Sequence, residues 1–182
     1  MIQNPIDCAM LIRPASSPDA KLVSQILHSF SHTFTISPAG EGAEAFFETI
    51  TERAILELIA QKNVVYLVAE TPEGSIAGIA AMRDNRALIH LFVKTEYQRA
   101  GLGRKLWERL CADALRAGNR GEFTVNSSIG AVPVYQRFGF AIAGPRIEKH
   151  GGAYIPMTLR IARESVSSDR SLTEHSTRHT KD

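Results

Sequence analysis

The stretch Gln98-Arg99-Ala100-Gly101-Leu102-Gly103-Arg104 carries the clearest signal of chemistry, because it combines two glycines with two arginines. Glycine lets backbone amides approach a bulky ligand closely, since it has no Cβ. If a helix begins here, its first amides have no intrahelical partners and carry partial positive charge. Such amides bind phosphate, and the arginines add positive charge suited to phosphate oxygens. The stretch therefore predicts a phosphate-binding loop, with a plain glycine-rich helix start as the alternative.

Two familiar phosphate loops do not match this stretch. A dinucleotide fingerprint needs a third glycine where Leu106 stands, and no segment follows the G-x-x-x-x-G-K-[ST] pattern of a P-loop. The flanking segments do match: the apolar run 87–93 predicts a buried strand, and the periodic segment 102–117 predicts a helix. A junction between a strand and a helix is the context that a phosphate loop needs.

The stretch 98–104 resembles Q/R-x-x-G-x-G/A, the pyrophosphate loop of the GCN5-related N-acetyltransferase (GNAT) superfamily, whose members bind acetyl-CoA. A second segment, Val134 to Phe140, resembles the Y-x-x-x-G-F segment of the same superfamily. The resemblance spans roughly 9–161; it is strongest over 88–140 and weak before Asn63. It implies an N-acetyltransferase that moves an acetyl group from acetyl-CoA to a primary amine of a small molecule or peptide, by direct transfer in a ternary complex.

The resemblance also implies roles for individual residues in binding acetyl-CoA. Backbone amides of the loop would contact the pyrophosphate, and free backbone groups at the end of the preceding strand would pair with the pantetheine amides. The amide of Val93 would be the oxyanion donor. Asn126 matches a position that contacts the cofactor arm, although an asparagine in a turn is nearly as good a reading. The implied cofactor-binding set is Leu91, Phe92, Val93, Arg99, Ala100, Gly101, Leu102, Gly103, Arg104 and Asn126.

Tyr135 matches the tyrosine that protonates the thiolate of coenzyme A in the superfamily. A phenol with a pKa near 10 stays protonated at neutral pH and can still give up its proton, so it suits a leaving thiolate. The alternative is a half-buried tyrosine whose hydroxyl is satisfied within the protein.

A general base is harder to identify. Strict alternation along the strand 87–93 places Ile89, Leu91 and Val93 on one face, and Leu88, His90 and Phe92 on the other. The first face offers no ionisable group, and His90 lies on the wrong face unless a β-bulge intervenes. The candidates for the base are therefore His90, Glu41, Glu44, Glu96 and water.

The acceptor is expected between the first helical connection and the last hairpin. Most candidate residues there are neutral or aromatic, which does not favour a strongly anionic acceptor; they are His32, Phe34, Phe46, Phe47, His150 and Tyr154. No cysteine or serine stands in a nucleophile motif, so a covalent acyl-enzyme is not predicted. A non-catalytic coenzyme A-binding module that acts as a sensor or partner surface is the alternative function. An unrelated nucleotide-binding α/β domain is a weaker one.

Composition limits the partners. The formal net charge of +2 over 182 residues is too mild to predict nucleic-acid binding. Cys8 and Cys111 show neither metal-ligand nor disulfide spacing, so no metal is expected, and the pair His175 and His179 lacks a third ligand nearby. No signal peptide or membrane-spanning run is visible. We expect a cytoplasmic monomer or homodimer.

The elements that must position these residues follow from periodicity and turn signals. Two units are expected: a domain over 9–161, and a polar, disordered tail over 162–182. The domain should hold strands and helices in the order β-α-α-β-β-β-α-β-α-β-β, an α/β fold whose mixed, largely antiparallel sheet carries helices on both faces. The predicted strands are 9–13, 64–69, 76–83, 87–93, 122–126, 140–149 and 153–161, and the predicted helices are 17–30, 44–61, 102–117 and 132–138.

Overall fold

The computed structural model describes residues 10–37 and 39–161. Cys8, Ala9 and the predicted tail 162–182 therefore lie outside the described residues. The chain forms β1 (Leu11–Pro14), α1 (Ala20–Ser29), α2 (Glu44–Thr49), α3 (Glu52–Ile59), β2 (Val64–Glu70), β3 (Ile76–Arg83), β4 (Ala87–Val93), α4 (Leu102–Arg116), β5 (Glu122–Ser127), α5 (Val132–Arg137), β6 (Ala141–Ile142), β7 (Ile147–Lys149) and β8 (Gly152–Arg160).

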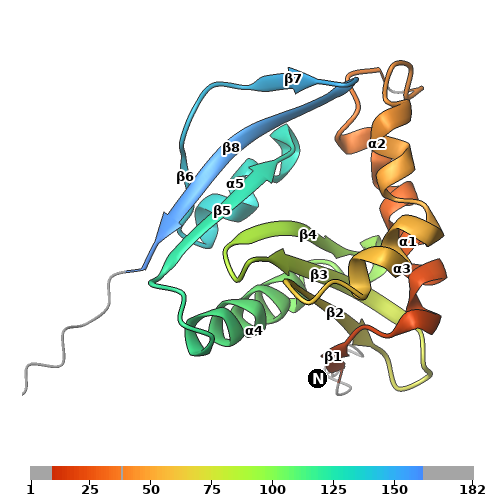
Figure 1. Cartoon of the computed structure of the whole chain (residues 1–182), viewed down its shortest axis with the longest axis vertical. Helices are drawn as coiled ribbons and strands as arrows, with labels where there is room; N and C mark the ends of the chain where they lie inside the picture. Colours follow the sequence, from red (N-terminus) through yellow and green to blue (C-terminus); the bar gives the residue numbers. More distant parts are fainter. Residues whose placement is uncertain (1–9, 38, 162–182) are drawn as a thin grey trace, which may run out of the picture.

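One sheet of eight strands has the order β1-β2-β3-β4-β5-β8-β6, and β7 pairs with β8. All neighbours are antiparallel except β4 and β5, which confirms the predicted fold class. The parallel pair is held together only at Ala87↔Thr124 and Leu88↔Val125. Beyond these residues the two strands diverge, so that the two halves of the sheet open like a V (Figure 1). Among the described helices, none is long and apolar enough to cross a membrane.

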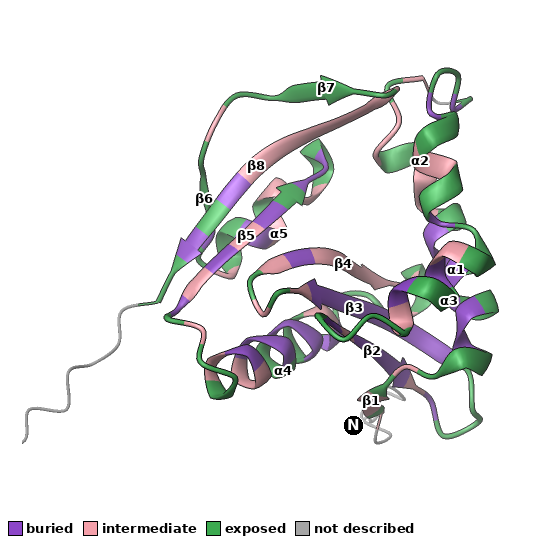
Figure 2. Cartoon of the chain, in the orientation of Figure 1, coloured by how far each residue is buried: buried purple, intermediate pink, exposed green. Residues whose placement is uncertain are grey.

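Each face of the sheet has its own hydrophobic core (Figure 2). The apolar faces of α4 and α5 pack on one side, where Leu106, Leu110 and Phe123 are almost fully buried. Cys111 is buried in this core, as its place on the apolar face of α4 predicts. On the other side, α1 and α3 cover β2 and β3 with residues such as Val23 and Ile55. Burial of these side chains is the main force that holds the helices on the sheet.

Two predicted elements are wrong in their continuity. The helix expected over 44–61 is broken into α2 and α3, because Thr51 is extended and its side chain accepts a hydrogen bond from the amide of Ala54 as an N-cap. The strand expected over 140–149 is divided into β6 and β7, which pair with different parts of β8. The intervening Gly144-Pro145 interrupts it, since proline cannot donate to a sheet ladder.

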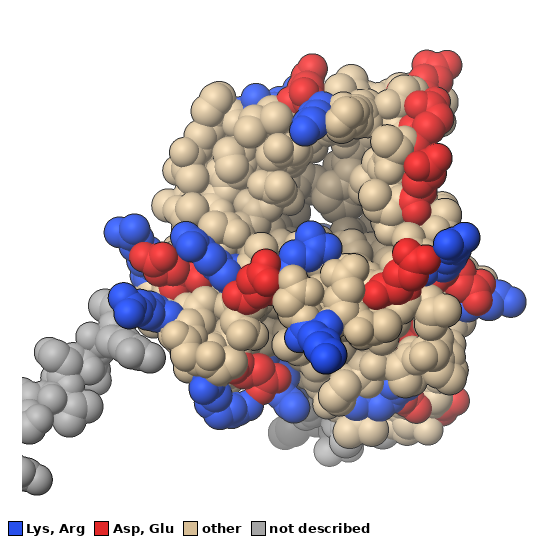
Figure 3. All heavy atoms as spheres, viewed as in Figure 1, with Lys and Arg blue, Asp and Glu red and all other residues tan. Residues whose placement is uncertain are grey.

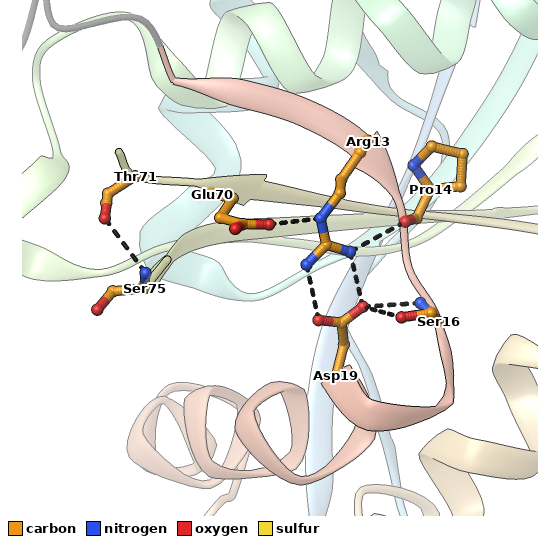
Figure 4. A network of polar contacts seen from close by, with 7 residues as sticks. All are labelled: Arg13, Pro14, Ser16, Asp19, Glu70, Thr71 and Ser75. Carbon is orange, nitrogen blue, oxygen red and sulfur yellow. Dashed lines mark hydrogen bonds and ion pairs between the residues drawn. The ribbon is translucent and has the colours of Figure 1, made fainter. Parts of the chain in front are cut away.

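The start of α1 is tied to the sheet by a charged network (Figure 4). The helix predicted from residue 17 begins at Ala20 instead, and a short 3₁₀ turn, Ser17–Asp19, capped by Ser16, precedes it. Arg13 on β1 donates from both terminal nitrogens to the carboxylate of Asp19, at 2.8 and 2.9 Å, and from Nε to Glu70 at the end of β2. The pKa of Asp19 is lowered to about 2, mainly by the hydrogen bonds from the Arg13 guanidinium.

We predict that Asp19→Asn lowers the free energy of unfolding by about 1–3 kcal/mol at pH 7, because Arg13 loses one of its two charged partners. The stabilising effect of a carboxyl whose pKa is lowered on folding is present above pH 4 and fades as the pH falls towards 2. Wild type and variant should therefore converge in acid, as measured by urea unfolding between pH 2.5 and 7. Glu57→Gln, which breaks the exposed pair with Arg53, is the control and should cost at most about 0.5 kcal/mol. A pH-independent difference for Asp19→Asn would contradict the assignment.

Candidate functional site

A bulge in β4 decides which side chains face each side of the sheet. Ala81 on β3 pairs with His90 and Met82 pairs with Leu88, so Ile89 is the extra residue. As a result Leu88 joins Leu91 and Val93 on the α4 side, and Ile89 joins His90 and Phe92 on the other side. The predicted alternation was therefore wrong for Leu88 and Ile89. A bulge is present, but it leaves His90 on the side opposite Leu91 and Val93.

On the α4 side, a cavity of about 450 Å³ lies between the loop 98–104 and α5. We call it the loop cavity. Its walls are Leu91 and Val93 of β4, the start of α4, Tyr135 of α5 and Phe138 directly after α5. It brings together most of the predicted cofactor-binding residues with the predicted acid: Leu91, Val93, Arg99, Gly101, Leu102, Gly103, Arg104 and Tyr135.

The loop presents a helix end that has no cap of its own. Gly101, the N-cap of α4, has φ of 80° and provides no capping side chain. The helix has no acidic residue in its first turn, and its first closing bond runs from the amide of Lys105 to the carbonyl of Gly101. The amides of Leu102, Gly103 and Arg104 are therefore open to an anion.

Gln98 fastens this loop to the strand before it. Its side-chain amide donates to the carbonyl oxygen of Val93 at 2.8 Å, while the amide of Lys94 donates to Ala77 on β3. Neighbouring residues of a strand direct their backbone groups to opposite sides. The N–H of Val93 therefore points away from β3, into the gap between β4 and β5, where it has room to bind a ligand.

Arg104 is held against the end of α5 by two contacts, and it also pairs with a residue of its own helix. Its guanidinium lies 5.3 Å from the centre of the Phe138 ring, donates to the carbonyl of Arg137 at 3.4 Å and pairs with Glu108 at 3.9 Å. Phe138 and Arg137 also line the loop cavity. Both residues belong to the segment Val134 to Phe140, whose resemblance to the superfamily is visible in the sequence. No side-chain role was assigned to them from that resemblance.

Tyr135 is 7% exposed and lines the loop cavity. Its ring packs edge-on against Phe138 and Phe140, with centroids 6.3 and 5.8 Å away. Burial raises the pKa of the phenol well above its usual value. The phenol is therefore protonated at neutral pH and can donate a hydrogen bond to an anion in the cavity.

On the opposite side of β4, a second cavity of about 380 Å³ lies between β4, α2 and the β7–β8 hairpin. We call it the aromatic cavity, after Phe34, Phe46, Phe92 and Tyr154 in its walls. Figure 3 shows the hollow between α2 and the hairpin, bordered mainly by uncharged side chains. His90 and His150 also line it, whereas the other predicted acceptor residues, His32 and Phe47, do not.

His90 reaches this cavity with a defined orientation. Its Nδ1 forms a hydrogen bond of 3.0 Å with the hydroxyl of Tyr66, a residue that is 4% exposed. Burial, and secondarily the charge of Arg83, lowers the pKa of His90 to about 4. Burial raises the pKa of Tyr66. The pair is therefore neutral at physiological pH.

The remaining predicted site residues lie elsewhere. Phe92 and Asn126 line the aromatic cavity instead of the loop cavity, and Ala100 lines neither. Glu96 lines a separate cavity beside α1. Glu41 and Glu44 bond within their own loop, to Ser37 and to the amide of Gly42. The catalytic roles of Glu41, Glu44 and Glu96 stay predictions. Within residues 10–37 and 39–161, no cluster of three His, Cys, Asp or Glu side chains is placed to hold a metal ion.

Comparison with known proteins finds a protein family that matches the chain. A family model described as an acetyltransferase (GNAT) domain matches residues 34–161. A comparison with curated protein sequences finds no significant match.

Solved structures share the fold. A GCN5-related N-acetyltransferase from Rhodopseudomonas palustris superposes with a TM-score of 0.69 at 19% identity, over 84% of this chain and 96% of that one. The PaiA N-acetyltransferase from Thermoplasma acidophilum, in complex with coenzyme A, has a TM-score of 0.67 at 16% identity, over 84% and 99%. A spermidine N-acetyltransferase from Vibrio cholerae, in complex with CoA and spermine, has a TM-score of 0.56 at 15% identity, over 83% of this chain and 95% of that one.

We predict that Gly103→Val abolishes binding of coenzyme A to the loop cavity. A Cβ at this position would lie 3.6 Å from Val93, an ordinary contact, so the fold should tolerate a side chain there. The added methyl groups would instead stand over the open amides of α4 and keep a phosphate away. Calorimetry should detect no coenzyme A binding, with a thermal midpoint close to wild type. Gly130→Val, which enters open space, is the control and should bind normally. Undiminished affinity in folded Gly103→Val would exclude the loop as the phosphate site.

Proposed function

Because the chain belongs to the GNAT acetyltransferase family, we propose that it transfers the acetyl group of acetyl-CoA directly to a primary amine in a ternary complex. One observation carries the proposal. The loop cavity and the aromatic cavity are lined by different residues of β4, on the two sides of the strand, along the part that has no registered pair with β5. A thioester that enters along the loop cavity thus meets an amine held in the aromatic cavity.

The loop cavity would hold acetyl-CoA through groups already described. The open amides at the start of α4, with Arg99 and Arg104, bind the pyrophosphate. The unpaired backbone of β4 beyond Leu88 pairs with the pantetheine amides in the gap. The N–H of Val93 points into the same gap, where it stabilises the oxyanion that forms on the thioester carbonyl.

In the transfer, the neutral amine attacks the thioester carbon, a C–N bond forms, and the C–S bond breaks. Tyr135 donates its proton to the departing thiolate. The nitrogen loses one proton on becoming an amide, and this proton returns to Tyr135 through water. One proton leaves the amine and one arrives on sulfur, so the exchange balances.

We assign the removal of the amine's proton to water rather than to His90. A ring with a pKa near 4 is a weak base at neutral pH. The protonated Tyr66 phenol has Nδ1 of His90 as its hydrogen-bond partner. When the phenol donates this hydrogen bond, the ring proton lies on Nε2 and Nδ1 is occupied by the phenol. Glu41, Glu44 and Glu96 do not line the aromatic cavity.

We predict that Tyr135→Phe lowers kcat by about 100-fold or more, the usual contribution of a positioned acid. The substitution keeps the ring that packs on Phe138 and removes only the hydroxyl. Stability and acetyl-CoA affinity should therefore change little. The measurement is the rate of coenzyme A release with a panel of amines at saturating acetyl-CoA. Transfer at the wild-type rate would disprove the role of Tyr135, and binding of acetyl-CoA without transfer to any amine would favour a non-catalytic coenzyme A-binding module.

A second prediction concerns pH. Only the neutral amine reacts, so kcat/KM should rise about tenfold per pH unit below the amine's pKa. Because the pKa of His90 is lowered, its ring is already neutral above pH 5 and should add no inflection between pH 5.5 and 7.5. A pH profile of kcat/KM for wild type and His90→Gln tests this. An inflection near pH 6.5 that disappears in His90→Gln would restore His90 as the base.

A further inference from the structure

We propose that the acceptor is a small primary amine on an apolar, ring-bearing skeleton with no second positive charge. The inference rests on the proposed function and assigns a substrate class to the aromatic cavity. Three properties of the cavity support it: its aromatic wall, its charge and its closure.

The wall is a continuous set of rings. Phe34 lies between Phe46 and Phe92, with centroid distances of 6.0 and 5.5 Å, and His90 follows Phe92 at 6.2 Å. All four rings line the cavity, together with aliphatic side chains such as Ile50 and Ile89. Aromatic rings at such spacings pack favourably against another ring, by stacking or edge to face. A flat apolar skeleton therefore suits this wall better than a polar chain.

The charges disfavour a cation. Among the described residues that line the cavity there is no Asp or Glu, and the one side chain with a permanent charge is Lys149 on β7. His90 is neutral. On this side of the molecule, one row of acidic side chains runs along the outer edge over α2, and others lie on the hairpin and across the middle (Figure 3). A second ammonium group would lose its hydration in the cavity without gaining a carboxylate partner. The reacting amine is likewise favoured in its neutral form.

The top of the cavity is closed by the loop before α2. The amide of Ala153 donates to the carbonyl of Phe34 at 2.9 Å, and the amide of Ile36 donates to Gly151 at 2.9 Å. At the hairpin tip, a Cβ on Gly151 would lie 2.2 Å from the carbonyl oxygen of Gly42, so the two backbones touch. The hairpin tip and this loop meet beside α2 (Figure 1). The bridge blocks this end of the cavity to an extended chain, and a small amine fits the cavity's volume of about 380 Å³.

Three amines that differ in a ring and in a second amine group test the inference at saturating acetyl-CoA. They are 2-phenylethylamine, pentylamine and 1,5-diaminopentane. We expect kcat/KM to be highest for 2-phenylethylamine and at least tenfold lower for the diamine than for pentylamine, which differs from it only by the second amine. A diamine that is used as well as pentylamine would overturn the charge argument. Pentylamine used better than 2-phenylethylamine would overturn the ring argument.

Two variants probe the wall and the charge separately. Phe46→Ala should raise KM for 2-phenylethylamine about tenfold with a smaller effect on pentylamine. Lys149→Glu, at an exposed position, should raise kcat/KM for the diamine several-fold relative to that for pentylamine. Leu56→Ala, at an exposed position on α3, is the control and should change none of these values. Equal effects of Phe46→Ala on both monoamines, or no gain from Lys149→Glu, would contradict the inference.

Binding separates this inference from the proposed function. Calorimetry measures acetyl-CoA alone, and then 2-phenylethylamine with coenzyme A present. If acetyl-CoA does not bind, the proposed function fails. Suppose instead that acetyl-CoA binds, but that 2-phenylethylamine at a concentration on the order of 10 mM is neither turned over nor bound. The substrate class proposed here is then wrong, and the cofactor assignment stands.

Discussion

The short pairing between β4 and β5 is the constraint on which the rest of the site depends. The two parallel strands share only two registered residue pairs, at Ala87 and Leu88, and then separate. Each unpaired residue leaves backbone groups that must find another partner, since a strand edge cannot stay unsatisfied in a dry interior. The gap therefore provides hydrogen-bonding groups, the N–H of Val93 among them, where a thioester would meet an amine. A fully paired sheet would have no room for either.

The extra residue at Ile89 has a comparable effect on side chains. Without the bulge, alternation would have directed Ile89 towards α4 and Leu88 away from it. With it, Ile89, His90 and Phe92 all face the aromatic cavity, while Leu91 and Val93 face the loop cavity. One strand thus contributes to both cavities, which keeps the proposed donor and acceptor sites adjacent on a rigid element.

The two cavities differ in charge, and the difference fits their proposed ligands. The loop cavity combines open helix amides with Arg99, Arg104 and Arg137, which suits a polyanion. The aromatic cavity holds neutral rings and a neutral His90, which suits an uncharged amine. The proposed reaction needs this separation, because the nucleophile must be neutral while the cofactor carries phosphate.

The sequence alone was sufficient for the features that depend on local chemistry. The loop 98–104 and the helix that begins at Leu102 follow from glycine conformation and helix periodicity. The segment around Tyr135 was identified through its resemblance to the Y-x-x-x-G-F segment of the superfamily, and the structure places loop and tyrosine around one cavity. The bulge at Ile89, the parting of β4 from β5, the partnership of His90 with Tyr66 and the bridge between Gly151 and Gly42 were decided by the tertiary structure. Each joins segments distant in the chain, and their register depends on how whole strands and loops pack against one another, which no local pattern of residues encodes.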